Sequence, residues 1–202
     1  MDIRPLRIDG AFEITPRQIR DDRGVFLESF RGDHLAGVLG HRMDVVQTNV
    51  SVSSRGTVRG IHFADVPVGQ AKYVTAVAGS LLDFVVDLRV GSPTFGEWDA
   101  VLLDSVDRRS VYLAEGLGHA FCALEDGTTA HYLCSAAYNP LSEHGINPLD
   151  ADLALSLPDG LEPLLSPKDA GAPTLAEAAA SGLLPTLEAC LAHTRSLDGT
   201  RR

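Results

Sequence analysis

The chain lacks the features that mark membrane, secreted and disulfide-stapled proteins. Its three cysteines, Cys122, Cys134 and Cys190, are odd in number and show no metal-ligand spacing. We expect reduced thiols in a cytoplasmic protein, two of them in core strands. No apolar run approaches the roughly 20 residues of a membrane span. The polar N-terminus is not followed by the apolar core of a signal peptide.

Positive charge is also scarce. The chain has 17 Lys and Arg residues against 27 Asp and Glu residues, which gives a net charge of −10. This balance argues against a nucleic-acid partner, because no basic stripe is present to release counterions. An anionic small molecule needs only a local cluster of donors. Only two of the cations are lysines, Lys72 and Lys168. In a chain whose other cations are arginines, a lysine indicates a site that uses a compact ammonium group.

The middle of the chain has the pattern of a β protein. Residues 81–89 alternate, with Leu82, Phe84, Val86 and Leu88 on one side and Asp83 and Asp87 on the other. Gly79-Ser80 predicts a hairpin turn before that strand. Many short strands separated by turn signals predict a sandwich, jelly roll or barrel. The other expected strands cover residues 25–30, 45–53, 71–78, 97–103, 109–113, 119–124 and 129–135.

The C-terminal part changes to helix. Thr174 and Glu177 form a capping-box pattern that opens an alanine-rich helix, and Gly182 closes it. A second helix is expected from Pro185 to about Leu197. At 202 residues we expect one domain over residues 1–202. Its core with the N-terminal strands would cover about 1–165, and a helical appendage about 166–202.

His62 is the most informative single residue. It lies in a strand-like run, three residues after Arg59 and ten before Lys72. A strand histidine is most often a hydrogen-bonded core residue, but two flanking cations favour a functional role. An imidazole is a natural general base at neutral pH, and a nearby cation can stabilise a developing oxyanion.

A metal site is the first alternative for His62, because jelly-roll proteins often hold iron, zinc or manganese. No His-x-His pair occurs anywhere in the chain, and the remaining histidines are scattered. A catalytic metal site needs at least three convergent ligands, which this pattern does not supply. We therefore predict no metal site.

Two tyrosines near the end of the β region are further candidates. Tyr132 lies inside an expected strand and Tyr138 lies just beyond it. Both would suit a sheet surface as ordinary amphipathic aromatics. In a functional site, one phenol would act as a general acid and the other ring as a stacking platform for a base or sugar. The residues alone leave this assignment open.

A series of short motifs carries a family resemblance over nearly the whole chain. In order they are Asp22-Arg23-Gly24 with Glu28, Gln47-Thr48-Asn49, Ser51-Val52-Ser53, Arg59-Gly60-Ile61-His62-Phe63, Gln70-Ala71-Lys72-Tyr73, Val86-Asp87-Leu88-Arg89, Gly91-Ser92-Pro93-Thr94-Phe95-Gly96, residues 115–121, Tyr132-Leu133-Cys134-Ser135, Tyr138-Asn139-Pro140 with Glu143, and Ser166-Pro167-Lys168-Asp169. The chain resembles the dTDP-4-dehydrorhamnose 3,5-epimerase family, the cofactor-independent nucleotide-sugar epimerases of the cupin class. The resemblance implies a mainly β, cupin-type jelly-roll sandwich with short C-terminal helices.

The resemblance also implies a reaction that needs no cofactor. The substrate would be dTDP-4-keto-6-deoxyglucose, whose C4 ketone acidifies the hydrogens at C3 and C5. His62 would remove a proton, and Asp169 would orient and polarise its ring. Lys72 would stabilise the enolate oxygen, and Tyr132 would return a proton from the opposite face. The enzyme would serve dTDP-rhamnose or antibiotic-sugar biosynthesis.

Binding roles follow from the same resemblance. Tyr138 would stack on the thymine ring, and the chain would form a homodimer with exchanged N-terminal strands. The residues that would hold the nucleotide and sugar are Arg23, Glu28, Gln47, Asn49, Arg59, His119, Glu143 and Lys168. The cations among them explain how an acidic protein accepts a diphosphate.

Two departures from the family pattern touch the pocket but no proton-transfer group. The chain has Gly118-His119-Ala120 in place of Ala-His-Gly, and Leu157-Pro158 in place of Trp-Pro. Inversion at both carbons is our first hypothesis, and a 3-epimerase is the alternative. A metal-dependent cupin enzyme and a non-catalytic nucleotide-sugar binding module represent other classes. The binding module should have lost the acid–base pair, which this chain keeps.

Overall fold

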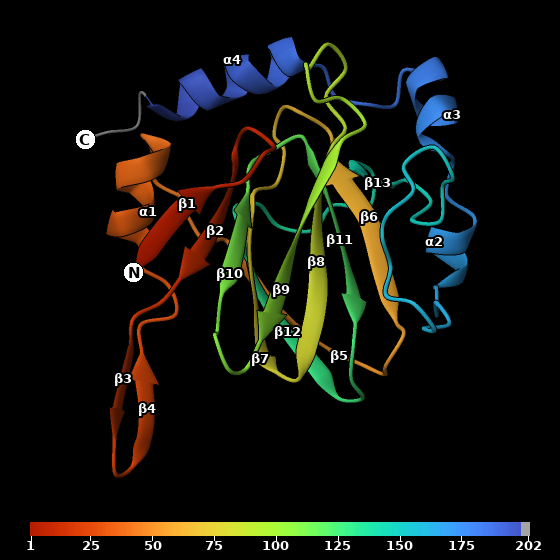
Figure 1. Cartoon of the computed structure of the whole chain (residues 1–202). Helices are drawn as coiled ribbons and strands as arrows, with labels where there is room; N and C mark the ends of the chain where they lie inside the picture. The colour runs from red at the N-terminus through yellow and green to blue at the C-terminus, as the bar shows by residue number, and fades with distance from the viewer. Residues whose placement is uncertain (199–202) are drawn as a thin grey trace.

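Two antiparallel β-sheets packed face to face form the body of the molecule in the computed structural model, which describes residues 1–198 (Figure 1). The larger sheet has six strands in the order β1 (Asp2–Pro5), β2 (Ala11–Thr15), β10 (Ser110–Leu113), β7 (Lys72–Ala78), β12 (Thr128–Cys134) and β5 (Gln47–Ser53). The smaller sheet has five, in the order β13 (Glu143–Gly145), β6 (Val58–Ala64), β11 (Leu117–Ala123), β8 (Ser80–Asp87) and β9 (Trp98–Asp104). The predicted jelly-roll sandwich is confirmed.

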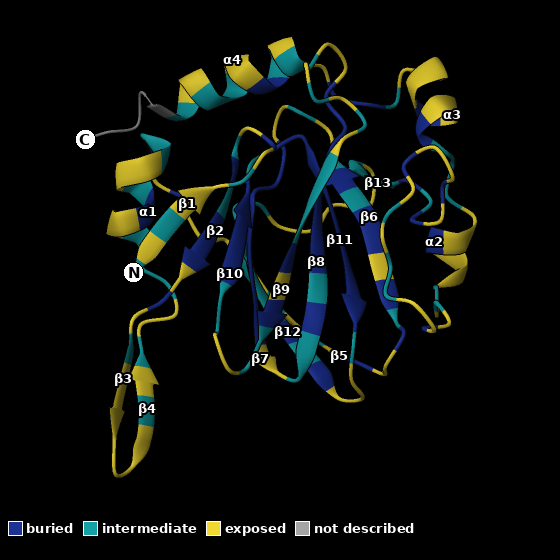
Figure 2. Cartoon of the chain, viewed as in Figure 1, coloured by how far each residue is buried: buried dark blue, intermediate teal, exposed yellow. Residues whose placement is uncertain are grey.

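The core between the sheets follows from the alternation along β8. Leu81 and Val85 point inward and pack with residues of the six-stranded sheet such as Val74 and Val111. Phe84 and Val86 point to the other face of their sheet, where they are buried in a second cluster. A strand with both faces covered needs apolar residues on both, and β8 is buried over most of its length (Figure 2).

The prediction of a hairpin at Gly79-Ser80 is wrong. β7 pairs with β10 and β12, whereas β8 pairs with β9 and β11, so Gly79 carries the chain from one sheet to the other. Its φ is +68°, and a Cβ there would lie 2.7 Å from the hydroxyl oxygen of Thr128. The glycine is therefore required, but the turn signal alone does not tell whether the flanking strands pair.

The C-terminal helices were predicted at the right places. α3 (Leu175–Ala180) begins at Thr174, whose side chain accepts a hydrogen bond from the Glu177 amide while the Glu177 carboxylate accepts one from the Thr174 amide. α4 (Leu187–Asp198) follows, and a one-turn helix, α2 (Pro167–Ala170), precedes α3. The last part of the predicted appendage, residues 199–202, lies outside the described residues. No helix within residues 1–198 is long and apolar enough to cross a membrane.

Two N-terminal elements lie outside the two sheets. α1 (Gly32–Leu39) was not predicted from the sequence, and its Leu35 packs over Tyr73 and Tyr112 on the outer face of the six-stranded sheet. β3 (Gln18–Asp21) and β4 (Gly24–Leu27) form a separate hairpin that projects from the body (Figure 1). Much of this hairpin is exposed, including Ile19 and Phe26 (Figure 2).

Candidate active site

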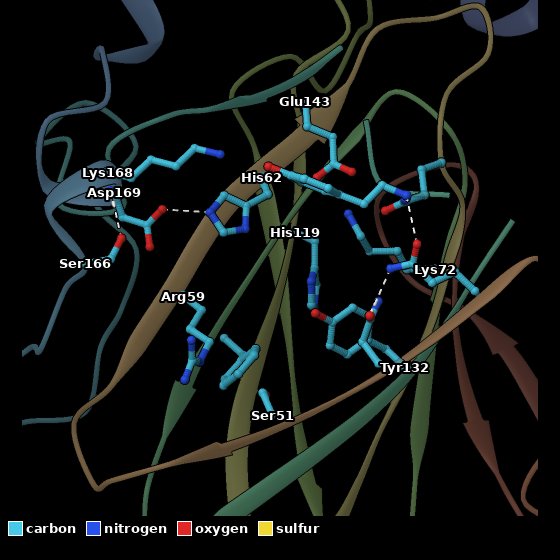
Figure 3. A pocket seen from close by; sticks show the side chains of 15 residues that line it. Ser51, Arg59, His62, Lys72, His119, Tyr132, Glu143, Ser166, Lys168 and Asp169 are labelled. Atoms are coloured by element: carbon cyan, nitrogen blue, oxygen red, sulfur yellow. Dashed lines mark hydrogen bonds and ion pairs between the residues drawn. The ribbon is translucent and has the colours of Figure 1, made fainter. Parts of the chain in front are cut away.

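A polar cavity of about 510 Å³ opens between the two sheets (Figure 3). The six-stranded sheet contributes side chains from β5, β7 and β12, and the five-stranded sheet contributes side chains from β6, β11 and β13. α2 closes one side. Every site residue predicted from sequence lines this cavity except Arg23 and Glu28. The lining residues are Gln47, Asn49, Ser51, Arg59, His62, Gln70, Lys72, His119, Phe121, Tyr132, Tyr138, Glu143, Ser166, Lys168 and Asp169.

His62 and Asp169 form a hydrogen-bonded pair on one wall. His62 Nε2 lies 2.7 Å from Asp169 Oδ1. With Nε2 engaged, Nδ1 is the ring nitrogen left to accept a proton. Burial by itself would raise the pKa of Asp169, but hydrogen bonds from His62 and the Ser166 hydroxyl hold it below the usual range. The carboxylate therefore stays ionised at neutral pH and can stabilise a protonated His62.

Local structure fixes the position of Asp169. Ser166 is the N-cap of α2, and its hydroxyl oxygen accepts a hydrogen bond from the Asp169 amide at 3.1 Å. Pro167 occupies the first turn, where its missing N–H is tolerated. Asp169 is 5% exposed although its helix lies at the surface. The short helix thus places the carboxylate toward His62 with little freedom to move.

Lys72 enters the cavity from the opposite sheet. It begins β7, pairs in register with Cys134 on β12, and is 7% exposed. Burial lowers its pKa, while the charges of Cys134, Glu143 and Asp83 act in the other direction. A buried ammonium is weakly solvated and interacts strongly with negative charge that develops nearby.

Tyr132 lies on β12, directly across from Asn49 on β5. Burial raises its pKa, so the phenol keeps its proton at neutral pH. A protonated phenol is the form that a proton donor requires. Because Tyr132 belongs to one sheet and His62 to the other, the two face the cavity from opposite walls (Figure 3).

Polar side chains at the mouth are organised around Gln47. Its amide nitrogen donates to Asn49 Oδ1 at 2.9 Å, and its Oε1 accepts from the Tyr138 amide at 2.8 Å. Tyr138 is 55% exposed at the mouth. Its ring is therefore free to stack on a planar ligand group.

Two cations flank the pair of His62 and Asp169. Arg59 precedes His62 on β6, and its Nε donates to the Ser53 hydroxyl at 3.2 Å. Lys168 precedes Asp169 on α2 and is exposed. Both side chains line the same cavity, which suits an anionic ligand such as a diphosphate.

Arg23 and Glu28 do not reach this cavity within one chain. Arg23 is at the tip of the β3–β4 hairpin, where it pairs with Asp21 and its side chain is 90% exposed. Glu28 follows β4 and pairs with Arg31. The hairpin points away from the body (Figure 1).

Four lining residues were not among the predicted site residues. Ser51 and Phe121 continue the alternation of Asn49 and His119 along β5 and β11, so period-two reasoning would have found them. Gln70 and Ser166 lie in two of the family motifs, but neither residue has a local signal that points to a cavity.

The metal alternative gains no support from this geometry. Among residues 1–198, no three His, Cys, Asp or Glu side chains are grouped in a way that would hold a metal ion. Each pocket histidine instead contacts a carboxylate, His62 with Asp169 and His119 with Asp83.

Comparison with known proteins identifies close relatives. A family model described as dTDP-4-dehydrorhamnose 3,5-epimerase matches residues 5–177. The dTDP-4-dehydrorhamnose 3-epimerase of Streptomyces niveus is 56% identical over 194 residues, which cover 96% of this chain and 93% of that protein. The dTDP-4-dehydrorhamnose 3,5-epimerase of Mycolicibacterium smegmatis is 54% identical over 197 residues, or 98% of this chain and 97% of that protein.

Solved structures agree with the sequence relatives. The crystal structure of a 3'-monoepimerase from Streptomyces bikiniensis in complex with dTDP-quinovose superposes with a TM-score of 0.94 at 49% identity. The match covers 96% of this chain and 98% of that one. The fold of the chain is therefore the fold of this relative.

Proposed function

The chain belongs to the dTDP-4-dehydrorhamnose 3,5-epimerase family and is an isomerase, and from that premise we propose that it inverts C3 and C5 of dTDP-4-keto-6-deoxyglucose. The observation that carries the proposal is the placement of the base candidate His62 and the acid candidate Tyr132 on opposite walls of one cavity. Removal of a proton from one face and its return to the other inverts a carbon. Each positioned proton-transfer group contributes about 10²–10⁴-fold in rate.

His62 is the proposed base. Its Nε2–H donates to Asp169, and Nδ1 takes the proton from the carbon beside the ketone. The ring becomes positively charged in this step, and the ionised Asp169 stabilises it. Removal of the proton leaves an enolate whose negative charge is centred on the C4 oxygen.

Lys72 is the proposed partner of that oxygen. Its ammonium is buried on the wall opposite His62 and is free to donate to the developing enolate. Tyr132 then gives its phenolic proton to the carbon from the far face. His62 then releases its extra proton to solvent and Tyr132 takes one from solvent, so the reaction is neutral overall and consumes no co-reactant.

The remaining lining residues suit a nucleotide sugar. Arg59 and Lys168 would hold the diphosphate, and Tyr138 would stack on the thymine ring. Gln47, Asn49, His119 and Glu143 supply hydrogen-bonding groups along the cavity. The dTDP-quinovose complex of the S. bikiniensis relative supports a ligand of this class.

We also propose a homodimer in which the β3–β4 hairpin of each chain reaches the cavity of its partner. Ile19 and Phe26 of the hairpin are 54% and 65% exposed, and Val50 and Val52 are exposed on the outer face of β5. Apolar surface of this kind is typical of an interface. The arrangement would also bring Arg23 to a substrate. Sedimentation of a monomer at micromolar concentration would contradict it.

Inversion of C3 alone is the second candidate. It is favoured by the names of the S. niveus and S. bikiniensis relatives, which are a 3-epimerase and a 3'-monoepimerase. Both reactions would use the same base and acid. They would differ in which carbon of the sugar ring lies between His62 and Tyr132.

Incubation with dTDP-4-keto-6-deoxyglucose in deuterated water tests the proposal. Deuterium at C3 and C5, read by NMR, supports the double epimerase, whereas label at C3 alone supports the second candidate. The His62→Asn variant is the control and should incorporate label at least about 10²-fold more slowly. Folded wild-type protein that binds dTDP but incorporates no label would instead be a non-catalytic binding module.

A further inference from the structure

A second histidine–carboxylate pair joins a residue that lines the cavity, His119, to a buried residue behind it, Asp83. His119 Nε2 lies 2.7 Å from Asp83 Oδ2. β11 lies between β6 and β8, and His119 is the direct cross-strand partner of His62 on β6. The two pocket histidines are therefore neighbours on one sheet, and each has its own carboxylate.

Asp83 is an unusual residue for its position. It is 0% exposed and shares the inward face of β8 with Leu81 and Val85, which belong to the apolar core between the sheets. Its second oxygen, Oδ1, has no hydrogen-bond partner among the described residues. A buried carboxylate destabilises a fold unless positive charge or hydrogen bonds compensate it. Packing alone therefore does not account for Asp83.

The compensating groups both line the substrate cavity. His119 donates to Asp83 within the five-stranded sheet, and Lys72 interacts with it electrostatically from the opposite sheet. The other titratable groups that act on Lys72 are Cys134 on β12 and Glu143 on β13. Asp83 is thus a negative charge placed behind two groups that face the substrate.

We propose that Asp83 is a positioning residue for the epimerisation, which holds His119 with Nδ1 toward the substrate and keeps Lys72 in its charged form. This inference rests on the proposed function, because it explains how the ammonium of Lys72, the proposed partner of the C4 oxygen, keeps its positive charge. With Nε2 bound to Asp83, Nδ1 is the only ring nitrogen of His119 left for the sugar. Asp83 itself touches no substrate.

The interaction between Asp83 and Lys72 acts in the direction that this assignment needs, while burial shifts the pKa of each group toward its neutral form. Burial raises the pKa of Asp83, and His119 and Lys72 oppose that rise. Burial lowers the pKa of Lys72, and Asp83 is one of the negative groups that oppose the fall. Removing the charge of Asp83 should therefore let the Lys72 ammonium lose its proton at a lower pH.

The Asp83→Asn variant tests the charge while keeping the side-chain shape. We expect kcat at neutral pH to fall about tenfold or more, and the basic limb of the kcat profile to move to lower pH. The dissociation constant for dTDP should stay within about twofold of wild type, because dTDP lacks the hexose that His119 faces. Asp150→Asn is the matched control, since Asp150 is buried outside the cavity and accepts from the Leu175 amide. It should leave the pH profile unchanged.

A wild-type measurement covers the case in which Asp83→Asn fails to fold. Nitrogen-15 NMR of the histidine rings, assigned with His119→Asn, should find His119 with its proton on Nε2. A proton on Nδ1 alone would overturn the inference, as would an unshifted basic limb in folded Asp83→Asn. Absence of label in the wild-type protein would instead refute the proposed function itself, so the two failures are distinct.

Discussion

Replacing Asp169 by asparagine removes the negative charge beside His62 and keeps the shape of the side chain. The carboxylate is 2.7 Å from His62 Nε2, and its side chain is 6% exposed, so little water would replace the lost charge. The substitution leaves Ser166, the N-cap of α2, in place. The loss should therefore appear mainly in the proton-transfer step, with a smaller loss of stability from the broken contact with His62.

The magnitude follows from the type of hydrogen bond. A hydrogen bond to a charged group contributes about 1.5–3 kcal/mol. The His62 side chain is 35% exposed, so solvent screens part of the interaction and the lower half of that range applies. A loss of about 1.5–2 kcal/mol corresponds to a kcat roughly 10–30-fold below wild type. Removing His62 itself should cost about 10²–10⁴-fold.

Deuterium incorporation at C3 under saturating substrate measures both variants. The expected order of rates is wild type, then Asp169→Asn, then His62→Asn. An Asp169→Asn rate equal to wild type would refute the role of the carboxylate, and a rate below His62→Asn would show that the carboxylate acts elsewhere.

The pH dependence of stability gives a second check. The pKa of Asp169 is lowered, so its stabilising effect exists above the usual aspartate range and disappears as pH falls through the lowered value. The difference in melting temperature between wild type and Asp169→Asn should therefore become smaller as the pH is lowered.

Three further predictions concern Tyr132, Lys72 and Thr174. Tyr132→Phe should lose inverted product by about 10²-fold or more while C3 exchange persists, because His62 still returns a deuteron to its own face; NMR of the sugar that shows wild-type inversion would contradict this. Burial lowers the pKa of Lys72, so wild-type kcat should fall with rising pH at a midpoint below the usual lysine value of about 10.4, and Lys72→Gln should remove that limb from the rate profile. Thr174→Ala should lose about 1 kcal/mol of helix capping and about 2–4 °C in melting temperature, with kcat unchanged; a large loss of activity would show that α3 is coupled to the cavity.

Local patterns in the sequence predicted much of the fold. The alternation along β8 assigned its two faces correctly, and the capping box at Thr174 located the start of α3. α1 was missed because it is a single short helix whose N-cap, Arg31, makes no side-chain capping hydrogen bond. Patterns of this kind report on a few neighbouring residues, which is why they succeed for strands and capped helices.

Local patterns in the sequence did not predict which strands pair with one another or which side chains the buried carboxylates contact. The turn at Gly79 is real, yet β7 and β8 enter different sheets. Asp83 was assigned to one face of its strand, but its contact with His119 requires the register between β8 and β11. Alternation with period two names a face and not the strand that lies opposite.

The sequence by itself determined the chemical groups of this protein and the faces on which its strands present them. His62, Lys72, Tyr132 and the β-rich pattern are all visible there, and local residue preferences are enough to place them. Only the tertiary structure decided which groups meet. Asp169 lies 107 residues after His62 and reaches it through α2, and Tyr132 faces His62 because their strands belong to opposite sheets. Such contacts depend on packing between segments far apart in the chain, which no local pattern encodes.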